Sequence, residues 1–239
     1  MSVQLIVDIG NSHTKAAVFD GSLLREFVQD DVEHLVAMCE KWLPERAMIC
    51  ETGTDQRTLQ FVQERLPTIW YHPGLIHPIS NAYVTPETLG ADRIAGAVAA
   101  AGLFPGKTIM KIDFGSCNTI DYVDPQLGFM GGSISPGLQM RLRALHQFTR
   151  RLPDITFSGQ EEILLFGKDT ATSIQSGVLQ GIVLETDGFI DRYKASFPGL
   201  EVVATGGNAE WFASRLKNKI FVRPYLVMEG LNSILQQNV

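Results

Sequence analysis

The feature that most constrains the fold of this chain is a pattern that occurs twice. In each copy an apolar segment with the character of a strand ends in Asp-x-Gly, a short polar segment follows, and a second apolar segment comes next. The first copy, at residues 8–11, reads DIGN, and the second, at residues 113–116, reads DFGS. Each copy predicts two antiparallel strands joined by a polar turn. The repeat therefore predicts two related halves.

Apolar spacing along the rest of the chain alternates between strands and helices, which is typical of an α/β protein. No Pro/Ser-rich linker separates the halves, so we expect a boundary near Gly106, with one half at 1–107 and the other at 108–239. The expected strands are 3–7, 15–19, 23–28, 47–50, 108–114, 119–123 and 201–204. The expected helices are 33–43, 58–66, 92–103, 138–150, 172–193, 208–216 and 227–236, with a Gly-Pro loop at 131–137.

Composition excludes several classes of protein. The 20 Lys and Arg residues against 26 Asp and Glu leave a net charge of −6, which disfavours a generic nucleic-acid or membrane binder. The basic residues around 138–151 are then better explained as a solvated helix face than as an RNA-binding face. The three cysteines lack CxxC spacing, which argues against a disulfide framework or a zinc site and predicts a cytoplasmic protein. The longest apolar stretch, 94–104, is shorter than the roughly 20 residues that span a bilayer, and we expect no signal peptide.

The two repeated turns carry the chemistry. A carboxylate followed by glycine at the end of a buried strand leaves backbone N–H groups open to an anion, which suits Mg²⁺ and phosphate. In the first turn Asn11, Ser12 and Thr14 offer hydrogen bonds, and Lys15 can neutralise a phosphate. Each turn alone is compatible with an ordinary polar hairpin, but two facing turns can hold a triphosphate between them. A third segment, VVATGGN at 202–208, leads from a strand into a helix and either meets an adenosine or is a tight turn that needs glycine.

Taken in this order, the three segments resemble the nucleotide site of the acetate-kinase, sugar-kinase and actin superfamily, whose fold is α/β with two ribonuclease-H-like halves, mixed sheets and flanking helices. Closer motifs resemble the type III pantothenate kinases over nearly the whole chain. These motifs are D-x-G-N-x-x-x-K at 8–15, GADR at 90–93, D-x-G-S at 113–116, GG at 131–132 followed by PG at 136–137, and TGG at 205–207.

This resemblance implies ATP-dependent phosphorylation of the pantothenate 4′-hydroxyl, the first step of coenzyme A synthesis, with Mg²⁺ and a monovalent cation, K⁺ or NH₄⁺. It places Asp8 near Mg²⁺, makes Asp113 the ligand of the monovalent cation, and sets the glycine pair beside the adenosine. Residues 115–119 depart from the family, reading GSCNT where GTATT is usual, which bears on cation dependence and nucleotide affinity. The residues implied for ATP are Asp8, Ile9, Gly10, Asn11, Ser12, His13, Thr14, Lys15, Ser116, Gly206 and Gly207.

The same resemblance makes Asp92 the general base, which must lie within hydrogen-bond reach of the attacking hydroxyl. An Asp at the head of an Ala-rich helix also suits an N-terminal cap, and the two roles are compatible. Arg93 can pair with the carboxylate of pantothenate. Thr170 matches a position that reaches the substrate from the neighbouring subunit, which implies a homodimer. The residues implied for the substrate are Tyr83, Gly90, Ala91, Asp92, Arg93 and Thr170.

A second class of function stays open, because a fold and a nucleotide site do not prove turnover. The chain can instead be a non-catalytic, nucleotide-binding regulator on the same fold. The GADR motif at 90–93 discriminates between the two, since a regulator has no need of a base and a carboxylate clamp beside the phosphates. A related sugar or acetate kinase would need a different acceptor pocket, and no motif in the sequence supports one.

Overall fold

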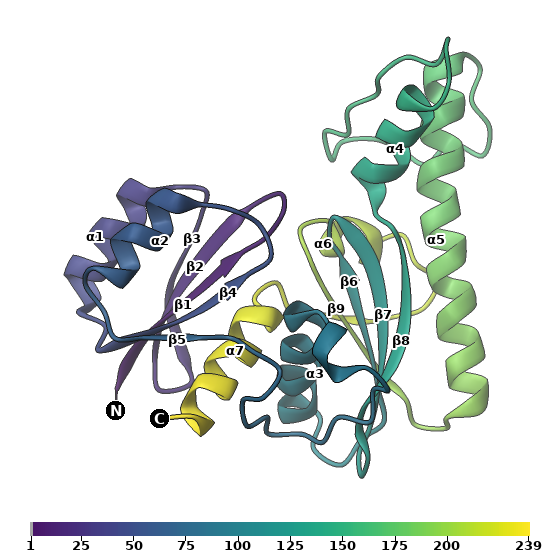
Figure 1. Cartoon of the computed structure of the whole chain (residues 1–239). Helices are drawn as coiled ribbons and strands as arrows, with labels where there is room; N and C mark the ends of the chain where they lie inside the picture. The colour runs from purple at the N-terminus through teal and green to yellow at the C-terminus, as the bar shows by residue number, and fades with distance from the viewer. Residues whose placement is uncertain (1) are drawn as a thin grey trace. The chain divides into compact units, whose positions relative to one another are not determined.

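The computed structural model describes residues 2–239 and divides the chain into two compact units, each of which is described here by itself (Figure 1). The first unit runs to Leu103 and includes Leu127–Phe129 and Tyr225–Val239. The second unit holds Phe104–Gln126 and Met130–Pro224. Each unit is built around a mixed, five-stranded sheet.

The two sheets repeat one topology. In the first, in the order β3-β2-β1-β4-β5, the first three strands are antiparallel and β4 and β5 run parallel to β1. In the second, in the order β10-β9-β6-β7-β8, β7 is antiparallel to β6, whereas β9 and β10 are parallel to it. The predicted α/β class with two related halves is confirmed. The strands are β1 (Val3–Ile9), β2 (Thr14–Asp20), β3 (Leu23–Gln29), β4 (Arg46–Glu51), β5 (Thr68–Trp70), β6 (Ile109–Phe114), β7 (Cys117–Asp124), β8 (Gly128–Pro136), β9 (Glu201–Thr205) and β10 (Phe221–Val222).

Both faces of the first sheet are covered, because the strands alternate apolar side chains between two cores. Leu5 and Val7 of β1 face one core with α1 (Val32–Trp42) and α2 (Gln56–Gln63). Ile6 faces the other core with α3 (Ala91–Leu103). Both α1 and α2 begin at an aspartate whose side chain accepts a backbone N–H, which stabilises the helix start. A short 3₁₀ helix, η1 (Pro86–Thr88), precedes α3.

The C-terminal helix α7 (Leu226–Gln237) corrects the expected division at 107/108. The sequence analysis places residues 225–239 in the second half, but α7 packs along α3 in the first unit (Figure 1). Its buried residues Leu231 and Ile234 join the core behind β1, and a Cβ at Gly230 would lie 1.8 Å from the carbonyl oxygen of Ala95. This close approach joins segments far apart in the chain, so no local pattern announces it.

In the second unit, three helices cover one face of the sheet: α4 (Leu138–Gln147), α5 (Thr170–Ser196) and α6 (Ala209–Ala213). Met110, Ile112 and Phe114 of β6 point into this core. The predicted Gly-Pro loop at 131–137 is wrong, because most of it belongs to β8. A Cβ at Gly132 would lie 1.8 Å from the carbonyl oxygen of Ile120 on β7, so the glycine permits a close approach of two strands rather than a loop.

Other boundaries differ from the sequence-based expectation by a few residues. Helix α5 starts at Thr170 because Asp169 and Thr172 form a capping box, and it continues to Ser196. The short strands β5 and β10 were not expected. No helix within residues 2–239 is long and apolar enough to cross a membrane. Cys39, Cys50 and Cys117 are all free thiols.

Candidate active site

The first predicted phosphate turn is a tight hairpin between β1 and β2. Asp8 lies opposite Lys15 in the strand register, and the Gly10 N–H donates to the His13 carbonyl over 3.0 Å. Asp30 holds the far side of the turn, because its carboxylate accepts from the Thr14 N–H at 2.7 Å and lies 2.5 Å from His13 Nδ1. Burial by itself raises the pKa of Asp30, but the bonds from His13 and Thr14 outweigh it and hold the pKa below its ordinary value. These hydrogen bonds hold the turn in one defined conformation.

A second segment supports this turn from the side and was missed by sequence reasoning. The N–H groups of Thr52 and Gly53 both donate to the Ile9 carbonyl, over 2.8 and 2.9 Å. A Cβ at Gly53 would lie 2.1 Å from the carbonyl oxygen of Gly10, so only glycine permits this approach. The hydroxyl of Thr14 also donates to Asp55, the N-cap of α2, over 2.8 Å. The available signal was the TGTD run at 52–55, between a strand and a helix.

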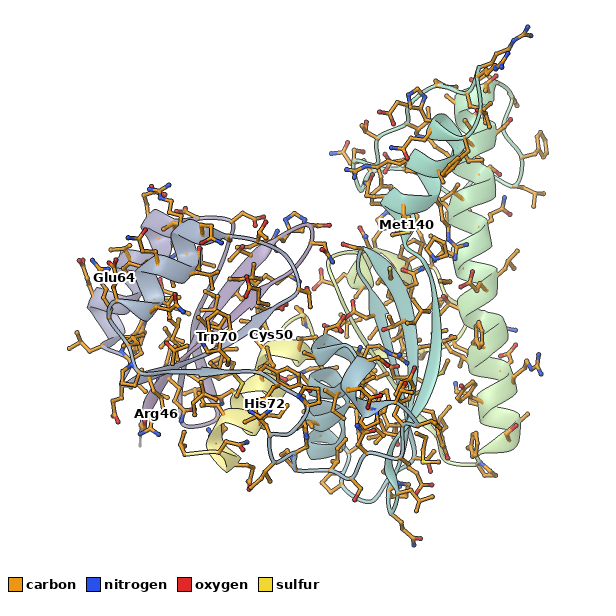
Figure 2. All side chains as sticks on the ribbon, viewed as in Figure 1. Arg46, Cys50, Glu64, Trp70, His72 and Met140 are labelled. Atoms are coloured by element: carbon orange, nitrogen blue, oxygen red, sulfur yellow. The ribbon has the colours of Figure 1, made fainter. Side chains whose placement is uncertain are left out.

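Two of the predicted carboxylates of the first unit converge on one buried thiol. Cys50, labelled in Figure 2, lies beside Asp8 in the parallel register of β1 and β4. Burial raises the pKa of the Cys50 thiol, and the nearby charges of Asp8 and Asp92 raise it further. Burial likewise raises the pKa of Tyr71 to about 12, with contributions from Cys50 and Asp92. The carboxylates of Asp8 and Asp92 therefore both lie near the Cys50 thiol, although 83 residues separate them in the sequence.

The GADR motif lies at the head of α3. Asp92 is exposed in the first turn of the helix, and its Oδ1 accepts from the Arg93 N–H over 2.9 Å. A Cβ at Gly90 would lie 2.6 Å from that same oxygen. The carboxylate thus contributes to the helix start and remains open to solvent. Ala91 is buried in the core behind it.

The Arg93 side chain is buried against two aromatic rings. Its guanidinium carbon is 5.5 Å from the ring centroid of Tyr83 and 5.5 Å from that of Phe129, a range in which a cation is attracted to a ring face. The two rings meet edge to face. Phe129 was missed by sequence reasoning, because a backbone bridge between Asn81 and Phe129 brings it to the motif from a distant part of the chain. Arg93 is thereby held in one orientation.

The second predicted turn gathers Asp113, Ser116 and the glycine pair within the second unit. Gly206 has φ +97°, and a Cβ there would lie 2.5 Å from Asp113 Oδ1 and 2.6 Å from the carbonyl carbon of Phe114. Any side chain at Gly206 would therefore collide with the strand end and strain the backbone. Gly207 faces open space, and Ser116 is exposed. The third segment thus packs against the second turn, and its expected contact with an adenosine stays a prediction.

Lys111 is the residue near this turn that the sequence analysis did not single out. It is fully buried, and its Nζ lies 3.2 Å from Asp121 Oδ2, 3.4 Å from Thr119 Oγ1 and 3.8 Å from Asp113 Oδ2. Two unit positive charges about 5 Å apart repel by about 3 kcal/mol at an effective dielectric constant of about 20. Asp113 with this ammonium beside it does not suit a monovalent cation. A lysine inside the apolar strand TIMKIDF was the available signal.

Thr170 is the first residue of α5 and lines an open pocket of about 620 Å³ within the second unit. Leu145 of α4, Leu152 and Ile174 form apolar parts of the lining. Lys168 and Asp169 add charge beside Thr170. This pocket contains none of the other predicted site residues.

Comparison with known proteins decides the family. A model of the type III pantothenate kinases matches residues 4–192. A type III pantothenate kinase of Bacteroides fragilis is 43% identical over 242 residues, which cover 99% of this chain and 98% of that protein.

This chain belongs to the type III pantothenate kinase family.

Solved structures agree on the fold alone. A protein of Campylobacter jejuni that is described in the Baf family of transcriptional activators superposes with a TM-score of 0.60 at 20% identity, covering 98% of both chains. A Listeria monocytogenes protein described as an N-acetylmannosamine kinase gives a TM-score of 0.54 at 12% identity, covering 99% of this chain and 100% of that one. The chain therefore shares its fold with these two proteins, one of them described as a sugar kinase, which agrees with the fold expected from the sequence.

The residues of this type III pantothenate kinase also bear on Mg²⁺. Within residues 2–239, no group of three or more His, Cys, Asp or Glu side chains gathers as a metal site. Mg²⁺ in kinases does not require such a group, because it keeps several waters and binds one or two carboxylates together with substrate phosphates. Asp8, a hard oxygen ligand at the end of β1 next to the polar turn, fits that mode.

Proposed function

We propose that this chain transfers the γ-phosphoryl group of ATP to the 4′-hydroxyl of pantothenate, the first step of coenzyme A biosynthesis. The observation that carries this proposal is the head of α3, where an exposed Asp92 stands next to a guanidinium held by two aromatic rings. In a pantothenate kinase, Asp92 would serve as the base for the 4′-hydroxyl, and the Arg93 guanidinium would bind the carboxylate of the same pantothenate molecule. Nothing in the structure favours the alternative of a non-catalytic regulator.

The proposed reaction is an in-line displacement. The 4′-oxygen of pantothenate forms a bond to the γ-phosphorus while the bond between that phosphorus and the β,γ-bridging oxygen breaks, and ADP leaves. The hydroxyl proton passes to Asp92 Oδ2 or Oδ1 as the new bond forms. Because phosphoryl transfer depends mainly on positioning and charge, the two phosphate turns do most of the remaining work.

Each turn, taken by itself, offers groups that can contact the ATP phosphates. The backbone N–H groups of Asn11 and His13 at the tip of the first turn and the Asn11 side chain can donate to phosphate oxygens, and Lys15 brings a positive charge from β2. Ser116 donates from the second turn. Gly206 lets the glycine segment approach the end of β6, and Gly207, which faces open space, leaves room for the adenosine. Asp8 would hold Mg²⁺, which neutralises phosphate charge when it is bound.

Arg93 would bind the carboxylate of pantothenate through two parallel hydrogen bonds. The rings of Tyr83 and Phe129 hold the planar guanidinium in one orientation, so little side-chain entropy is lost when the substrate binds. Gly90 and Ala91 are small residues beside Asp92 and Arg93, and they would let the backbone lie close to the carboxylate of pantothenate. A hydroxyl on Tyr83 adds a further contact for the substrate.

We further propose that the enzyme is a homodimer in which Thr170 completes the pantothenate site of the partner subunit. Leu165 and Phe166, which precede α5, are 81% and 65% exposed, and Phe148 after α4 is 86% exposed. Such large apolar side chains next to the Thr170 pocket suit a subunit interface. The expected cytoplasmic location stays a prediction.

Co-expression of two defective variants tests the dimer. Asp92→Asn and Thr170→Val are each expected to be impaired alone. If each site uses Asp92 of one subunit and Thr170 of the other, random dimers contain about a quarter intact sites, and activity at low pantothenate returns to that fraction. If both residues act within one subunit, mixing restores nothing, and the proposal is wrong. Sedimentation equilibrium of the wild type gives the mass of the assembly.

A product assay tests the function directly. Purified protein with Mg·ATP and pantothenate is expected to release ADP and form phosphopantothenate in equal amounts. Mass spectrometry measures both products. A matched reaction with an analogue that lacks the 4′-hydroxyl should give neither product above the background. ADP without phosphopantothenate would indicate another acceptor or a hydrolase. ATP binding without turnover would favour the regulator.

A further inference from the structure

We propose that Lys111 supplies, from within the chain, the positive charge that the family resemblance assigns to a bound monovalent cation, so that this enzyme works without K⁺. The proposal rests on the proposed function only in assuming that nucleotide phosphates meet the second turn. It replaces the expectation that Asp113 binds K⁺ or NH₄⁺.

The geometry comes from the pairing of β6 and β7. In this antiparallel register Lys111 lies opposite Asp121, and Asp113 lies opposite Thr119. Side chains two residues apart on a strand share a face, so all four point to the same side of the sheet. The opposite side carries Met110 and Ile112, which belong to the apolar core. The lysine is therefore part of a cross-strand group of four polar residues.

The ammonium is fixed in this group. Lys111 and Asp121 are both fully buried, and Nζ donates to Asp121 Oδ2 at 3.2 Å and to Thr119 Oγ1 at 3.4 Å. A buried charge is retained when it is paired and hydrogen-bonded, and these two acceptors provide that. With its stem held by the strand, the ammonium lies 3.8 Å from Asp113 Oδ2. This places an ammonium group beside the carboxylate at the second turn.

Asp113 needs such a cation because it lies at the turn where we place a triphosphate. A carboxylate and phosphates repel one another unless a positive charge stands between or beside them. The resemblance allows NH₄⁺ as well as K⁺, and a lysine side chain presents the same ammonium group on a tether. A second cation on Asp113 would be repelled by Lys111. The unusual GSCNT sequence of this turn, at 115–119, fits a site that has changed its cation requirement.

The wild-type protein tests the proposal without any substitution. The affinity for Mg·ATP is measured by calorimetry in KCl and in tetramethylammonium chloride at equal ionic strength, and phosphopantothenate formation is measured in the same two salts. We expect both quantities to agree within about twofold, because the required charge is built in. An affinity that is about tenfold or more weaker without K⁺ would overturn the proposal.

Removing the lysine should make Mg·ATP binding depend on a monovalent cation. Lys111→Met is expected to weaken Mg·ATP binding in tetramethylammonium chloride by about tenfold or more, and KCl or NH₄Cl should recover most of the loss. A merely structural role of Lys111 would not produce recovery by small cations. Lys217→Met, which removes an exposed lysine of the same unit, is the control and should behave as wild type in every salt.

The variant leaves Asp121 buried without its ion pair, so folding is checked by circular dichroism and thermal unfolding. If Lys111→Met does not fold, the double variant Lys111→Met/Asp121→Asn removes both charges and should show the same recovery by cations. A folded variant that binds Mg·ATP equally well in all salts would refute the role of Lys111. Because binding is measured without turnover, an absence of phosphopantothenate in every salt would count against the proposed function and not against this inference.

Discussion

Replacing Asp92 with asparagine is expected to lower turnover with pantothenate by about 10²-fold or more, since a positioned general base contributes roughly 10² to 10⁴ in rate. The substitution keeps the size of the side chain and an oxygen that can accept the Arg93 N–H, so the start of α3 should persist. Mg·ATP affinity should stay within about threefold of wild type, because the charge removed belongs to the acceptor side of the reaction. Single-turnover phosphopantothenate formation and calorimetry measure the two quantities.

Asp31→Asn is the matched control for this experiment. Asp31 is also an exposed aspartate at the start of a helix of the first unit, where it caps α1 by accepting the His34 N–H over 2.8 Å. Asparagine is an equally good N-cap, so this variant should keep wild-type turnover. Near-normal turnover of Asp92→Asn would remove Asp92 from the role of base, and an equal loss in both variants would indicate damage to the fold.

Arg93→Met is expected to raise the KM for pantothenate by about 10²-fold. Truncating one partner of a buried, hydrogen-bonded charge pair costs about 2–5 kcal/mol, and 2.7 kcal/mol corresponds to a factor of about 100. Methionine retains apolar packing against the rings of Tyr83 and Phe129, so the loss should reflect charge and not a cavity. Steady-state kinetics over a range of pantothenate concentrations measures the change.

A substrate analogue gives this prediction a second, independent readout. An analogue in which an alcohol replaces the carboxylate of pantothenate should be a poor substrate for wild type, and Arg93→Met should no longer distinguish it from pantothenate. Arg65→Met is the control, because Arg65 also stacks on a ring, with its guanidinium carbon 4.5 Å from the centroid of Phe61. If Arg93→Met still preferred the carboxylate, Arg93 would not be its clamp.

The sequence predicts much of this fold because its signals are local. The strand ends at Asp8 and Asp113 are followed by glycine and polar residues, and the structure has a hairpin at each. Apolar periodicity also places α1, α3 and α5 within a few residues of their observed limits. Errors occur where a distant segment decides. Gly132 looks like a loop residue until β7 packs against it, and α7 looks like part of the second half until it meets α3.

The candidate site divides in the same way. Motifs in single stretches of chain identify Asp8, Asp92, Arg93 and Gly206 as candidates. The supporting residues come from elsewhere: Phe129 reaches Arg93 across a backbone bridge, Gly53 meets the first turn, and Cys50 lies near two carboxylates. Their contribution depends on strand pairing, which a single sequence does not display.

What the sequence by itself determined is the class of fold and the repeat of two strand-turn-strand units, because turn chemistry and apolar periodicity act over a few residues. The family was indicated by the resemblance of the motifs and not by these patterns. What only the tertiary structure decided is the electrostatic setting of each group. Lys111 reads as an isolated charge in an apolar strand, and the antiparallel register turns it into the partner of Asp121 and the neighbour of Asp113. Charge interactions depend on distance through space and on burial, and both are set when the strands pair.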